Sequence, residues 1–460
     1  MNLTPSLEGA STDSQYGARP KFWFATYQLL WHLLLPFAFI RLAWRARHSA
    51  QYLSHLPERL AFGYQEPIKQ GAIWIHAVSV GETRAAQPLI DVYLSRGESI
   101  LLTHMTLNGR RTGAALFAKA IASGQMRQVY LPYDLCWAVA KFLRAFKPKF
   151  GLFMETEAWP TVVFDCAEKG LPLFLVNARL SERSARRVKQ FGKAGRSLFQ
   201  AFAGILAQTE FDAQRYQSLG VRNVEIVGNL KFDVPLDSNL VAQGQSWKHE
   251  IHEGGRLMVC AASTRDGEED LILQAWQDLL RNSAFERPPL LCIVPRHPER
   301  FSEIASLVDA AGLKLERRSD WANFPKLSDT TQVILGDSMG EMPLYYSAAD
   351  LVVMGGSLLP FGGQNLIEAC AAGCPVLLGE HTYNFQQAAI DAIQIGAAKR
   401  ISGELLLTKQ IALMEALREL LLHPAELSRM AKAAKIYTTA HQGATQKILS
   451  ALERQNFTLN

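Results

Sequence analysis

The chain has few cysteines, and they are not spaced as redox or zinc motifs require. Six cysteines are scattered over 460 residues, and no Cys-x-x-Cys occurs. Cys370 and Cys374 lie one helical turn apart, a spacing typical of small apolar side chains on a helix. This usage excludes a disulfide framework and the common zinc motifs, and it fits a reducing, cytoplasmic compartment.

Long basic runs, short repeats and low-complexity tracts are also absent. The net charge of +5 suits an anionic partner, but without a Lys/Arg run we expect no binding to nucleic acid. No Asp-x-Asp follows an apolar strand, and the acidic cluster at residues 266–270 is explained by the favourable dipole at a helix start. We therefore expect no metal ion and no cofactor.

The chain has one long apolar segment, at residues 22–44. Its first 19 residues would extend roughly 28 Å as a helix at about 1.5 Å per residue, close to the thickness of a hydrocarbon core. Arg41, Arg45 and Arg47 follow, so we expect the flank that leads into the rest of the chain on the cytoplasmic side. We favour a single N-terminal membrane anchor at residues 21–48. The alternatives are a helix that lies in the membrane interface and an apolar arm packed on the body.

The chain is too long for one ordinary core, and two of its segments share a pattern. Residues 73–86 and 257–273 each contain a short apolar run, a turn of small residues with a Ser and a Gly-Glu pair, and a helical pattern. Doubly wound α/β domains usually begin in this way. We therefore expect an α/β chain of two Rossmann-like domains that face a cleft and hold the substrate between them.

Strand and helix patterns alternate through both halves, which favours parallel sheets covered by helices. We expect a disordered N-terminus at 1–20, the anchor at 21–48, a first domain at 49–233, a linker at 234–255 and a second domain at 256–452. The strands expected in the first domain lie at 73–77, 99–103, 128–131, 150–154, 173–176, 205–208 and 224–227. In the second domain they begin at residue 257 and continue at 290–294, 332–336, 351–354 and 375–378, and residues 404–452 have a helical pattern.

Charged residues of the first domain follow apolar strands or lie at the domain junction, where α/β sheets do their chemistry. Glu82, in the motif SVGE, is a candidate general base; the alternative is a carboxylate that the helix dipole favours by about 0.3–1 kcal/mol. Glu155 and Glu157 follow another strand, and a functional role and solvated loop charges are both open for them. Lys231 would ordinarily be a solvated loop charge, but its place at the junction favours function.

Basic and glycine-rich segments of the second domain predict an anion site. Arg296, in the motif PRHPER, suits a bidentate phosphate contact, and the flanking prolines fix its loop. The motif GDSMGE at 336–341 follows a strand and enters a helix, whose first N–H groups favour an anion. Four glycines at residues 355–363 allow close approach of a ligand, and Glu368 could bind a ribose diol. The alternative is an ordinary turn followed by a capped helix.

Together these motifs resemble those of the bacterial 3-deoxy-D-manno-octulosonic acid (Kdo) transferases. The motifs are HAVSVGE at 76–82, YLPYD at 130–134, METE at 154–157, NARLS at 177–181, LKFD at 230–233, PRHPERF at 295–301 and MGE at 339–341. Each motif alone is short, but seven in the same order over most of the chain are specific.

The resemblance implies a GT-B glycosyltransferase that moves Kdo from CMP-Kdo to the lipid A precursor, lipid IVA, in lipopolysaccharide biosynthesis. We expect inversion, no metal, and a bacterial inner-membrane protein, single-pass or monotopic, with its catalytic domains on the cytoplasmic face. Glu82 matches the general base of the family, and Glu155 and Lys231 match residues assigned to transition-state stabilisation. The residues that match CMP-binding positions are Pro295, Arg296, Met339, Gly340, Glu341, Asn365, Leu366, Ile367 and Glu368.

Phosphates on such an acceptor need cations and hydrogen-bond donors. Our candidates for acceptor binding are Ser79, Arg84 and Arg179, with Arg110, Arg111 and Arg183 as further cations. Two other functions remain open: a GT-B transferase that uses a UDP-sugar on another lipid, and a non-catalytic nucleotide-binding module tethered to a membrane.

Overall fold

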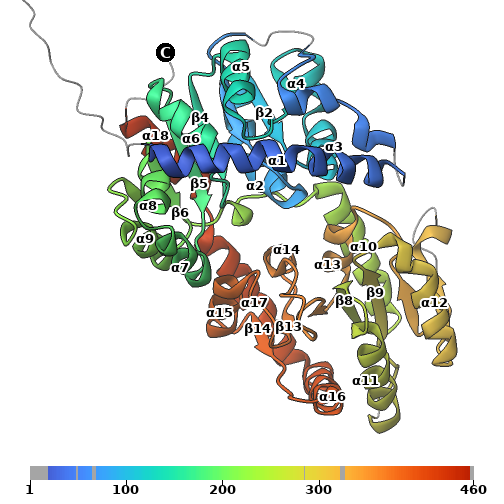
Figure 1. Cartoon of the computed structure of the whole chain (residues 1–460). Coiled ribbons are helices and arrows are strands. Elements are labelled where there is room, and N and C mark those ends of the chain that lie inside the picture. The colour runs from blue at the N-terminus through green and yellow to red at the C-terminus, as the bar shows by residue number, and fades with distance from the viewer. Residues whose placement is uncertain (1–18, 48–49, 65–68, 284, 322–326, 456–460) are drawn as a thin grey trace, which may run out of the picture. The chain divides into compact units, whose positions relative to one another are not determined.

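The computed structural model describes residues 19–47, 50–64, 69–283, 285–321 and 327–455, and it divides into two α/β units (Figure 1). Unit 1 comprises Met1–Val234 and Gln442–Asn460, and unit 2 comprises Pro235–His441. The disordered N-terminus expected at residues 1–20 lies almost entirely outside the described residues.

The sheet of unit 1 is parallel and has the strand order β3-β2-β1-β4-β5-β6-β7. Its strands are β1 (Ile73–His76), β2 (Ile100–His104), β3 (Met126–Tyr130), β4 (Phe150–Met154), β5 (Leu173–Ala178), β6 (Gly204–Ala207) and β7 (Val224–Ile226). All the strands expected here from the sequence are therefore present. The strand order reverses between β1 and β4, and doubly wound sheets bind their ligands at the carboxyl ends of such a strand pair.

Helices bury both faces of this sheet, as the continuous apolar strands require. Trp74 and Phe153 share a core with α5 and α6, whereas Ile75 and Leu152 share the opposite core with α2 and α18. The helices of unit 1 are α1 (Lys21–Ala46), α2 (Val80–Ser95), α3 (Leu107–Leu116), α4 (Ala118–Ala122), α5 (Cys136–Phe146), α6 (Pro160–Glu168), α7 (Glu182–Gln190), α8 (Gly192–Gln200), α9 (Glu210–Gln217) and α18 (Ala444–Arg454), with the 3-10 helices η1 (Ala50–Leu53), η2 (Leu56–Leu60) and η3 (Leu230–Phe232).

The last helix of the chain, α18, belongs to unit 1, so the second domain expected at 256–452 ends too late. The carboxylate of Asp233 fixes its start, because Oδ1 accepts from the N–H of Gly443 at 2.7 Å and Oδ2 from that of Thr445 at 2.6 Å. Ile448 and Leu452 then bury against the sheet of unit 1. The helical pattern was correct, but a local pattern does not show which sheet a helix covers.

The sheet of unit 2 is also parallel, with the order β10-β11-β9-β8-β12-β13-β14. Its strands are β8 (Met258–Thr264), β9 (Leu290–Pro295), β10 (Leu315–Arg317), β11 (Val333–Leu335), β12 (Leu351–Met354), β13 (Val376–Leu378) and β14 (Ala398–Arg400). Its helices are α10 (Ser238–Glu253), α11 (Glu268–Asn282), α12 (Phe301–Ala310), α13 (Met342–Ala348), α14 (Leu366–Ala371), α15 (Gln386–Gln394), α16 (Leu406–Leu422) and α17 (Pro424–His441), with η4 (Pro298–Arg300) and η5 (Arg318–Asp320). The switch point of this sheet lies between β8 and β12.

The linker expected at 234–255 is instead mostly the helix α10. Asp237 caps it, since its Oδ1 accepts from the N–H groups of Asn239 and Leu240. Gly244 lets α10 approach the carbonyl of Leu344 on α13 closely. The segment has mostly polar residues because only a narrow stripe of α10 is buried, which includes Trp247.

The N-terminal helix α1 lies along unit 1, with one side packed and the other exposed (Figure 1). Phe24 is buried and Trp31 packs against the core. The hydroxyl of Tyr27 donates to Oδ2 of Asp134 at 2.8 Å, and Nε2 of Gln28 donates to Oγ1 of Thr161 at 2.6 Å. By length and composition α1 could cross a membrane. The sequence left three possibilities for this segment: a membrane-spanning anchor, a helix in the membrane interface, and an apolar arm packed on the body. The contacts of α1 are those expected of the apolar arm.

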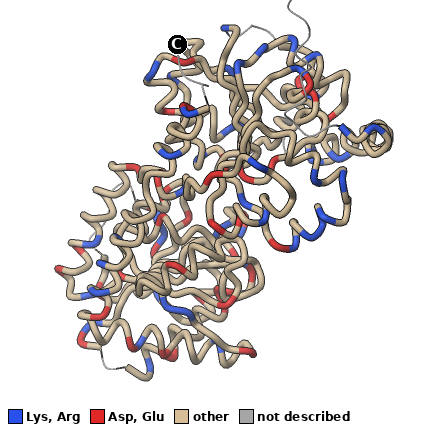
Figure 2. Tube along the Cα trace, turned by 90° about the vertical axis from the view of Figure 1, so that its left-hand side faces the viewer, with Lys and Arg blue, Asp and Glu red and all other residues tan. Residues whose placement is uncertain are grey.

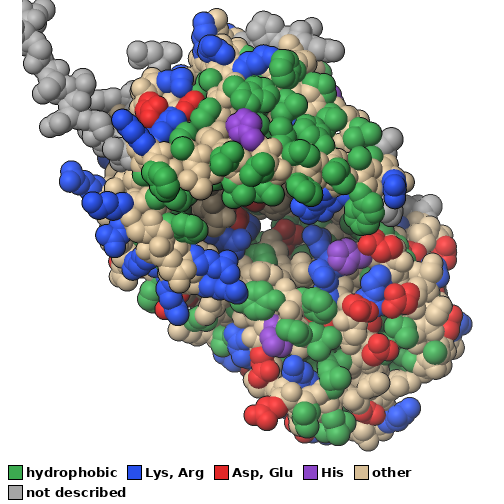
Figure 3. Space-filling view, in the orientation of Figure 1, with side chains coloured by type: hydrophobic (Ala, Val, Ile, Leu, Met, Phe, Trp, Pro, Cys, Tyr) green, Lys and Arg blue, Asp and Glu red, His purple; other side chains and the backbone are tan. Residues whose placement is uncertain are grey.

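The opposite side of α1 leaves large apolar side chains exposed (Figure 3). They are Phe22, Leu29, Leu30, Leu33, Leu34, Phe37, Ile40 and Trp44, which we call the exposed face of α1. A soluble surface seldom gathers so many large apolar groups, and such a patch marks an interaction site.

Candidate functional site

Glu82 lies in the first turn of α2, the helix that follows β1, and hydrogen bonds orient its carboxylate. Val78 N–H donates to Oε2 at 2.7 Å, and the hydroxyl of Ser79 donates to Oε1 at 3.0 Å. Ser79 is also the N-cap of α2. Burial raises the pKa of Glu82, and the charge of Glu155 raises it further, although the Val78 N–H and Lys231 oppose this. The carboxylate is thus half-buried, fixed in place and more basic than an exposed one.

Glu155 follows β4 and holds two cations. Nζ of Lys231 lies 2.8 Å from its Oε1, and Nε of Arg179 lies 3.0 Å from its Oε2. Burial alone would raise the pKa of Glu155, but the two cations outweigh burial and lower it, so the group is ionised. The backbone of Glu155 is left-handed, with φ of 56°, a conformation that costs free energy in a residue with a side chain.

Asn177 positions the backbone beside Lys231, a role that the sequence did not reveal. It is fully buried at the end of β5, and its Oδ1 accepts from the N–H of Leu230 at 3.0 Å. Asn229 then caps η3, because its Oδ1 accepts from the N–H of Lys231. The only indication in the sequence was the place of Asn177 in the motif NARLS.

Glu157 lies apart from Glu155, although the two are neighbours in the motif METE. Its Oε2 accepts from Nε1 of Trp159 at 2.8 Å and lies 3.9 Å from Nε2 of His76. Burial raises the pKa of Glu157 to about 7, with a contribution from the charge of Glu82. Unit 1 therefore brings three carboxylates, of Glu82, Glu155 and Glu157, to the carboxyl ends of β1 and β4.

The candidate acceptor residues have different surroundings. Ser79 is engaged as an N-cap, Arg179 is paired with Glu155, and Arg84 is exposed. Arg110 is paired with buried Glu58, and the guanidinium of Arg111 donates to the side chain of Gln51. These last two arginines are thus bound within unit 1.

Unit 2 places the candidate donor residues at the carboxyl ends of its strands. Pro295 ends β9 and is buried, and Arg296 follows with its side chain exposed. Gly340 has a φ of 86° and precedes the start of α13, beside exposed Met339. The carboxylate of Glu341 accepts from the guanidinium of Arg318 at 2.9 Å and from the hydroxyl of Ser338. This carboxylate is therefore already engaged in holding its own loop.

Asn365 caps α14, since its Oδ1 accepts from the N–H of Ile367, and its Nδ2 donates to Oε1 of Glu368 at 2.9 Å. Leu366 and Ile367 are buried, so only their backbone groups are available to a ligand. Among the described residues, no group of three or more His, Cys, Asp or Glu is placed to hold a metal ion.

Glu268 lies at the start of α11, as expected for the acidic cluster at 266–270, but its carboxylate also makes contacts that the helix-dipole interpretation did not include. Its side chain is fully buried at the start of α11. Oε2 accepts from the N–H groups of Gly356 at 2.6 Å and Arg265 at 3.0 Å, and Oε1 accepts from Leu358 at 3.0 Å and Leu359 at 3.2 Å. One carboxylate thus joins the turn after β8 to the glycine-rich turn after β12.

Comparison with known proteins identifies the family. A family model described as "3-Deoxy-D-manno-octulosonic-acid transferase (kdotransferase)" matches residues 54–234, and one described as "Glycosyl transferases group 1" matches residues 246–437. The 3-deoxy-D-manno-octulosonic acid transferase of Bordetella pertussis is 42% identical over 430 residues, or 93% of this chain and 98% of the relative. This chain belongs to the Kdo transferase family. The Kdo transferase of Haemophilus influenzae is 33% identical and aligns over 88% of this chain and 92% of its own.

The resemblance seen in the sequence is confirmed, and the chain is a glycosyltransferase. The UDP complex of S. aureus MnaA shares the fold, with a TM-score of 0.56, 13% identity, and coverage of 85% of this chain and 98% of that one. At that identity the similarity concerns the fold alone. The two parallel sheets confirm the expected GT-B class, with two Rossmann-like units.

Proposed function

We propose that this chain transfers Kdo from CMP-Kdo to lipid IVA in bacterial lipopolysaccharide biosynthesis. Family membership supports the type of reaction. The observation that carries the proposal is the arrangement at the β1–β4 switch point, where the carboxylate of Glu82 lies within electrostatic range of the Glu155–Lys231 pair. A carboxylate that only capped α2 would not need this pair beside it.

In this proposal Glu82 is the general base. Its raised pKa brings it closer to the working pH than an exposed carboxylate, and its two hydrogen bonds orient it. The acceptor O–H bond breaks as its proton passes to Glu82, and the oxygen bonds to the anomeric carbon of Kdo. The bond from that carbon to the phosphate oxygen breaks, CMP keeps the electron pair, and the anomeric centre inverts.

Lys231, Arg179 and Glu155 form a group with a net charge of +1 beside Glu82. This charge offsets negative charge on the Kdo carboxylate or on the departing phosphate. Glu155 holds both cations in place, so its own part is to orient them. Because side chains supply this charge, we propose that the reaction needs no metal ion and proceeds in the presence of EDTA.

The donor nucleotide binds to unit 2 in this proposal. Arg296 carries an exposed guanidinium suited to phosphate, and the N–H groups around Gly340 precede the start of α13. Leu366 and Ile367 contribute backbone groups alone, since their side chains are buried. Glu368 is the candidate for the ribose diol.

We further propose that the protein is monotopic on the cytoplasmic face of the inner membrane. α1 is attached to unit 1 from Phe24 to Leu42, so it cannot span a bilayer without losing those contacts. Its exposed face instead suits a helix that lies in the interface. This arrangement keeps the acceptor lipid and Glu82 on the same side of the membrane.

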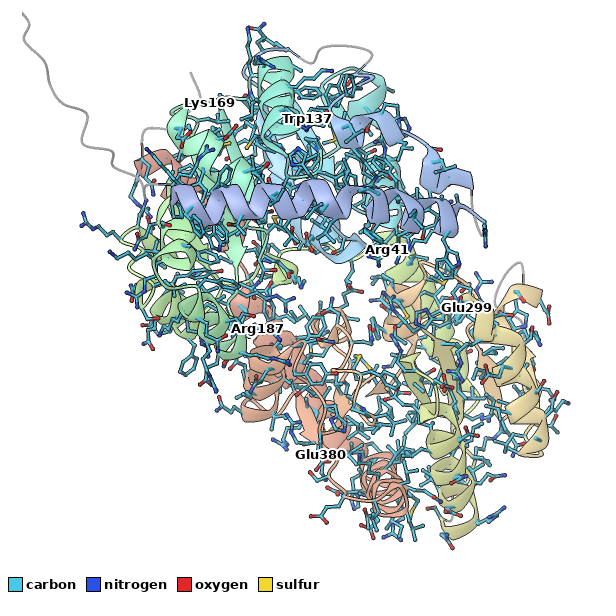
Figure 4. All side chains as sticks on the ribbon, viewed as in Figure 1. Arg41, Trp137, Lys169, Arg187, Glu299 and Glu380 are labelled. Carbon is cyan, nitrogen blue, oxygen red and sulfur yellow. The ribbon has the colours of Figure 1, made fainter. Side chains whose placement is uncertain are left out.

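α7 and α8 carry several exposed basic residues, of which Figure 4 labels Arg187, and Figure 2 marks the Lys and Arg positions along the trace in blue. Phe191, between these two helices, packs edge-on against Trp23 with ring centroids 6.5 Å apart. Anionic lipid headgroups attract such clusters. The exposed cations are Arg183, Arg186, Arg187, Lys189, Lys193 and Arg196.

Nucleotide selectivity separates this proposal from a UDP-sugar transferase. The thermal midpoint of the purified protein should rise with CMP and stay nearly unchanged with UDP at the same concentration, and the Arg296→Ala variant should lose the response to CMP. Equal protection by UDP would favour the alternative. If neither nucleotide raised the thermal midpoint, the assignment of unit 2 as the donor-binding unit would be wrong.

A further inference from the structure

Two arginines, Arg265 and Arg296, occupy neighbouring positions at the carboxyl edge of the sheet of unit 2. Arg265 follows β8 directly, and Arg296 follows β9. The N–H of Arg296 donates to the carbonyl of Thr264 at 3.0 Å, so a backbone hydrogen bond joins the two strand ends. Among the described residues, no Asp or Glu side chain forms an ion pair with either guanidinium. Both positive charges are therefore available to an anionic ligand.

Two further arginines at this edge are engaged with carboxylates. In the loop after β9, Nη1 of Arg300 lies 2.7 Å from Oε1 of buried Glu269. After β10, Nη2 of Arg318 lies 2.9 Å from Oε1 of Glu341. Each of these pairs joins two segments of unit 2. An arginine whose role at this edge is structural thus has a carboxylate partner within the fold.

Contacts that leave the guanidinium N–H groups unused hold Arg265 in place. Its Cζ lies 4.7 Å from the ring centroid of Phe361, in the glycine-rich turn after β12. Its backbone N–H donates to Oε2 of Glu268 at 3.0 Å, and the same oxygen accepts from the N–H of Gly356 in that turn. A ring contact fixes a guanidinium without using its hydrogen-bond donors. Those donors suit a bidentate contact with a planar carboxylate.

The end of β8, which leads into Arg265, has features typical of a binding site. Ser263 has a left-handed backbone with φ of 54°, which costs free energy in a residue with a side chain. Its carbonyl lies so close to Gly355 that a Cβ there would be 2.3 Å from the oxygen. Thr264 is buried, and its Oγ1 has no hydrogen-bond partner among the described residues. Strained residues and unpartnered buried groups gather where ligands bind.

The donor in the proposed function carries two negative charges next to the bond that breaks. One is on the phosphate that joins CMP to the sugar, and the other is on the carboxylate of Kdo, which is an octulosonic acid. The proposed function assigns Arg296 to the phosphate. We propose that Arg265 binds the carboxylate of Kdo and thereby selects an acidic sugar over a neutral one. This inference rests on the proposed function and names the residue that recognises the sugar.

The selectivity follows from the loss that a neutral sugar would cause. Such a sugar would displace water from the guanidinium of Arg265 without supplying an acceptor, and an unpaired polar group in a site gives strong discrimination. CMP has the phosphate but lacks the carboxylate. The two arginines should therefore respond differently to CMP and to CMP-Kdo.

Calorimetry without acceptor measures the dissociation constants of CMP and CMP-Kdo for the full-length protein. Arg265→Gln should weaken binding of CMP-Kdo by about 10- to 100-fold and binding of CMP by no more than about twofold, because only CMP-Kdo loses a charge-assisted contact. Arg296→Ala should weaken binding of both ligands. Arg265→Lys keeps the charge without the planar fork, so it should recover part of the loss.

Two controls separate this contact from a structural role. Arg281→Gln, at an exposed position on α11 where the arginine pairs with Asp278 of the same helix, should match wild type. Phe361→Leu removes the ring beneath Arg265 and should weaken binding of CMP-Kdo by only about two- to fivefold, the size of a lost cation–π contact. An equal loss in Phe361→Leu and Arg265→Gln would mean that Arg265 only braces the turn, and it would overturn the inference.

Two other results would also overturn it. Equal weakening of CMP and CMP-Kdo in Arg265→Gln would assign Arg265 to the phosphate, and unchanged CMP-Kdo binding would remove it from the donor site. Failure of the proposed function would look different. Wild-type protein would then bind CMP-Kdo but form no product with lipid IVA, while Arg265→Gln would still weaken CMP-Kdo alone. If wild-type protein did not bind CMP-Kdo, both proposals would be wrong.

Discussion

Nζ of Lys231 lies 2.8 Å from Oε1 of Glu155, and the other oxygen of this buried carboxylate lies 3.0 Å from Nε of Arg179. The sequence separates Lys231 from Glu155 by 76 residues. Burial of Asn177 and the cap of Asn229 fix the backbone that carries Lys231. The ammonium group of Lys231 is therefore fixed in place. Because it is already positioned, little rearrangement of the site is needed when negative charge develops on the reacting groups.

Removing the carboxylate that holds these cations should cost both stability and rate. We expect Glu155→Gln to lower the free energy of unfolding by about 2 kcal/mol, less than a fully buried pair because Arg179 is 44% exposed. Chemical denaturation measures this value, and the transfer assay measures kcat. In a double-mutant cycle Lys231→Met should add little to Glu155→Gln, since both changes break the same contact. Strictly additive effects would show that the two residues act independently.

Glu268 should control donor binding through the glycine-rich turn after β12. In Glu268→Gln the side-chain NH₂ group would face backbone N–H donors, and each unsatisfied donor costs about 1–3 kcal/mol. We expect a lower thermal midpoint and at least tenfold weaker CMP binding by calorimetry. Asp270→Asn, on the same helix but exposed, is the control and should behave as wild type. If Glu268→Gln folded and bound CMP as tightly as wild type, the glycine-rich turn after β12 would have no part in donor binding.

Asp134 should make stability depend on pH. Burial raises its pKa from 3.8 to about 6, even though it accepts hydrogen bonds from Tyr27, Thr161 and Val162. The folded state thus binds this proton more tightly than the unfolded state. The stabilisation is fully present below about pH 4 and is lost as pH rises through 6, a change of about 3 kcal/mol at 1.36 kcal/mol per unit.

The isosteric variant Asp134→Asn should lack this dependence. Urea unfolding at several pH values gives the difference in free energy of unfolding between wild type and Asp134→Asn. Between pH 4 and 6 the free energy of unfolding of the wild type should fall relative to that of Asp134→Asn. A constant difference across this range would mean that Asp134 does not titrate within it.

The exposed face of α1 should bind membranes in the plane of the interface. The double variant Leu33→Asp/Phe37→Asp should lose co-sedimentation with vesicles of phosphatidylethanolamine and phosphatidylglycerol, without a change in thermal midpoint, since both side chains are exposed. Ile436→Asp, an exposed apolar position on α17, is the control.

Depth measurements separate the in-plane helix from a spanning one. Spin labels at residues 22, 33 and 44 should lie at similar depths. A deep label at residue 33 between two shallow ends would instead indicate a transmembrane helix and would contradict the packing of α1 on unit 1.

Local patterns in the sequence predicted most strands because a parallel sheet buries both faces, and its strands are then continuous apolar runs such as β1 and β4. The strands that were missed, β10 and β14, are three residues long and only partly buried. Residues 182–200 form two helices, α7 and α8, with a break where Gly192 has a φ of 56°. A basic helical pattern on both sides concealed this break.

The site was only partly predictable because its decisive contacts join distant segments. The position of Glu82 at a strand end was visible in the sequence, but Glu268, in a similar position after β8, has partners 88 to 91 residues away. Its burial therefore left no local trace, although its position at a helix start was predicted correctly. Asn177 was missed for the same reason, since its partner Leu230 lies 53 residues on.

The most direct test of the central claim is turnover of CMP-Kdo with lipid IVA, with products resolved by mass. Wild-type protein should add the mass of one or more Kdo residues. Glu82→Gln, whose amide oxygen can still accept from the Val78 N–H, should fold and bind CMP normally but transfer about 10²–10⁴-fold more slowly. Glu182→Gln should match wild type. Near-wild-type transfer by folded Glu82→Gln would contradict the assignment of Glu82 as the base, and absence of any Kdo product with wild-type protein would contradict the proposed reaction.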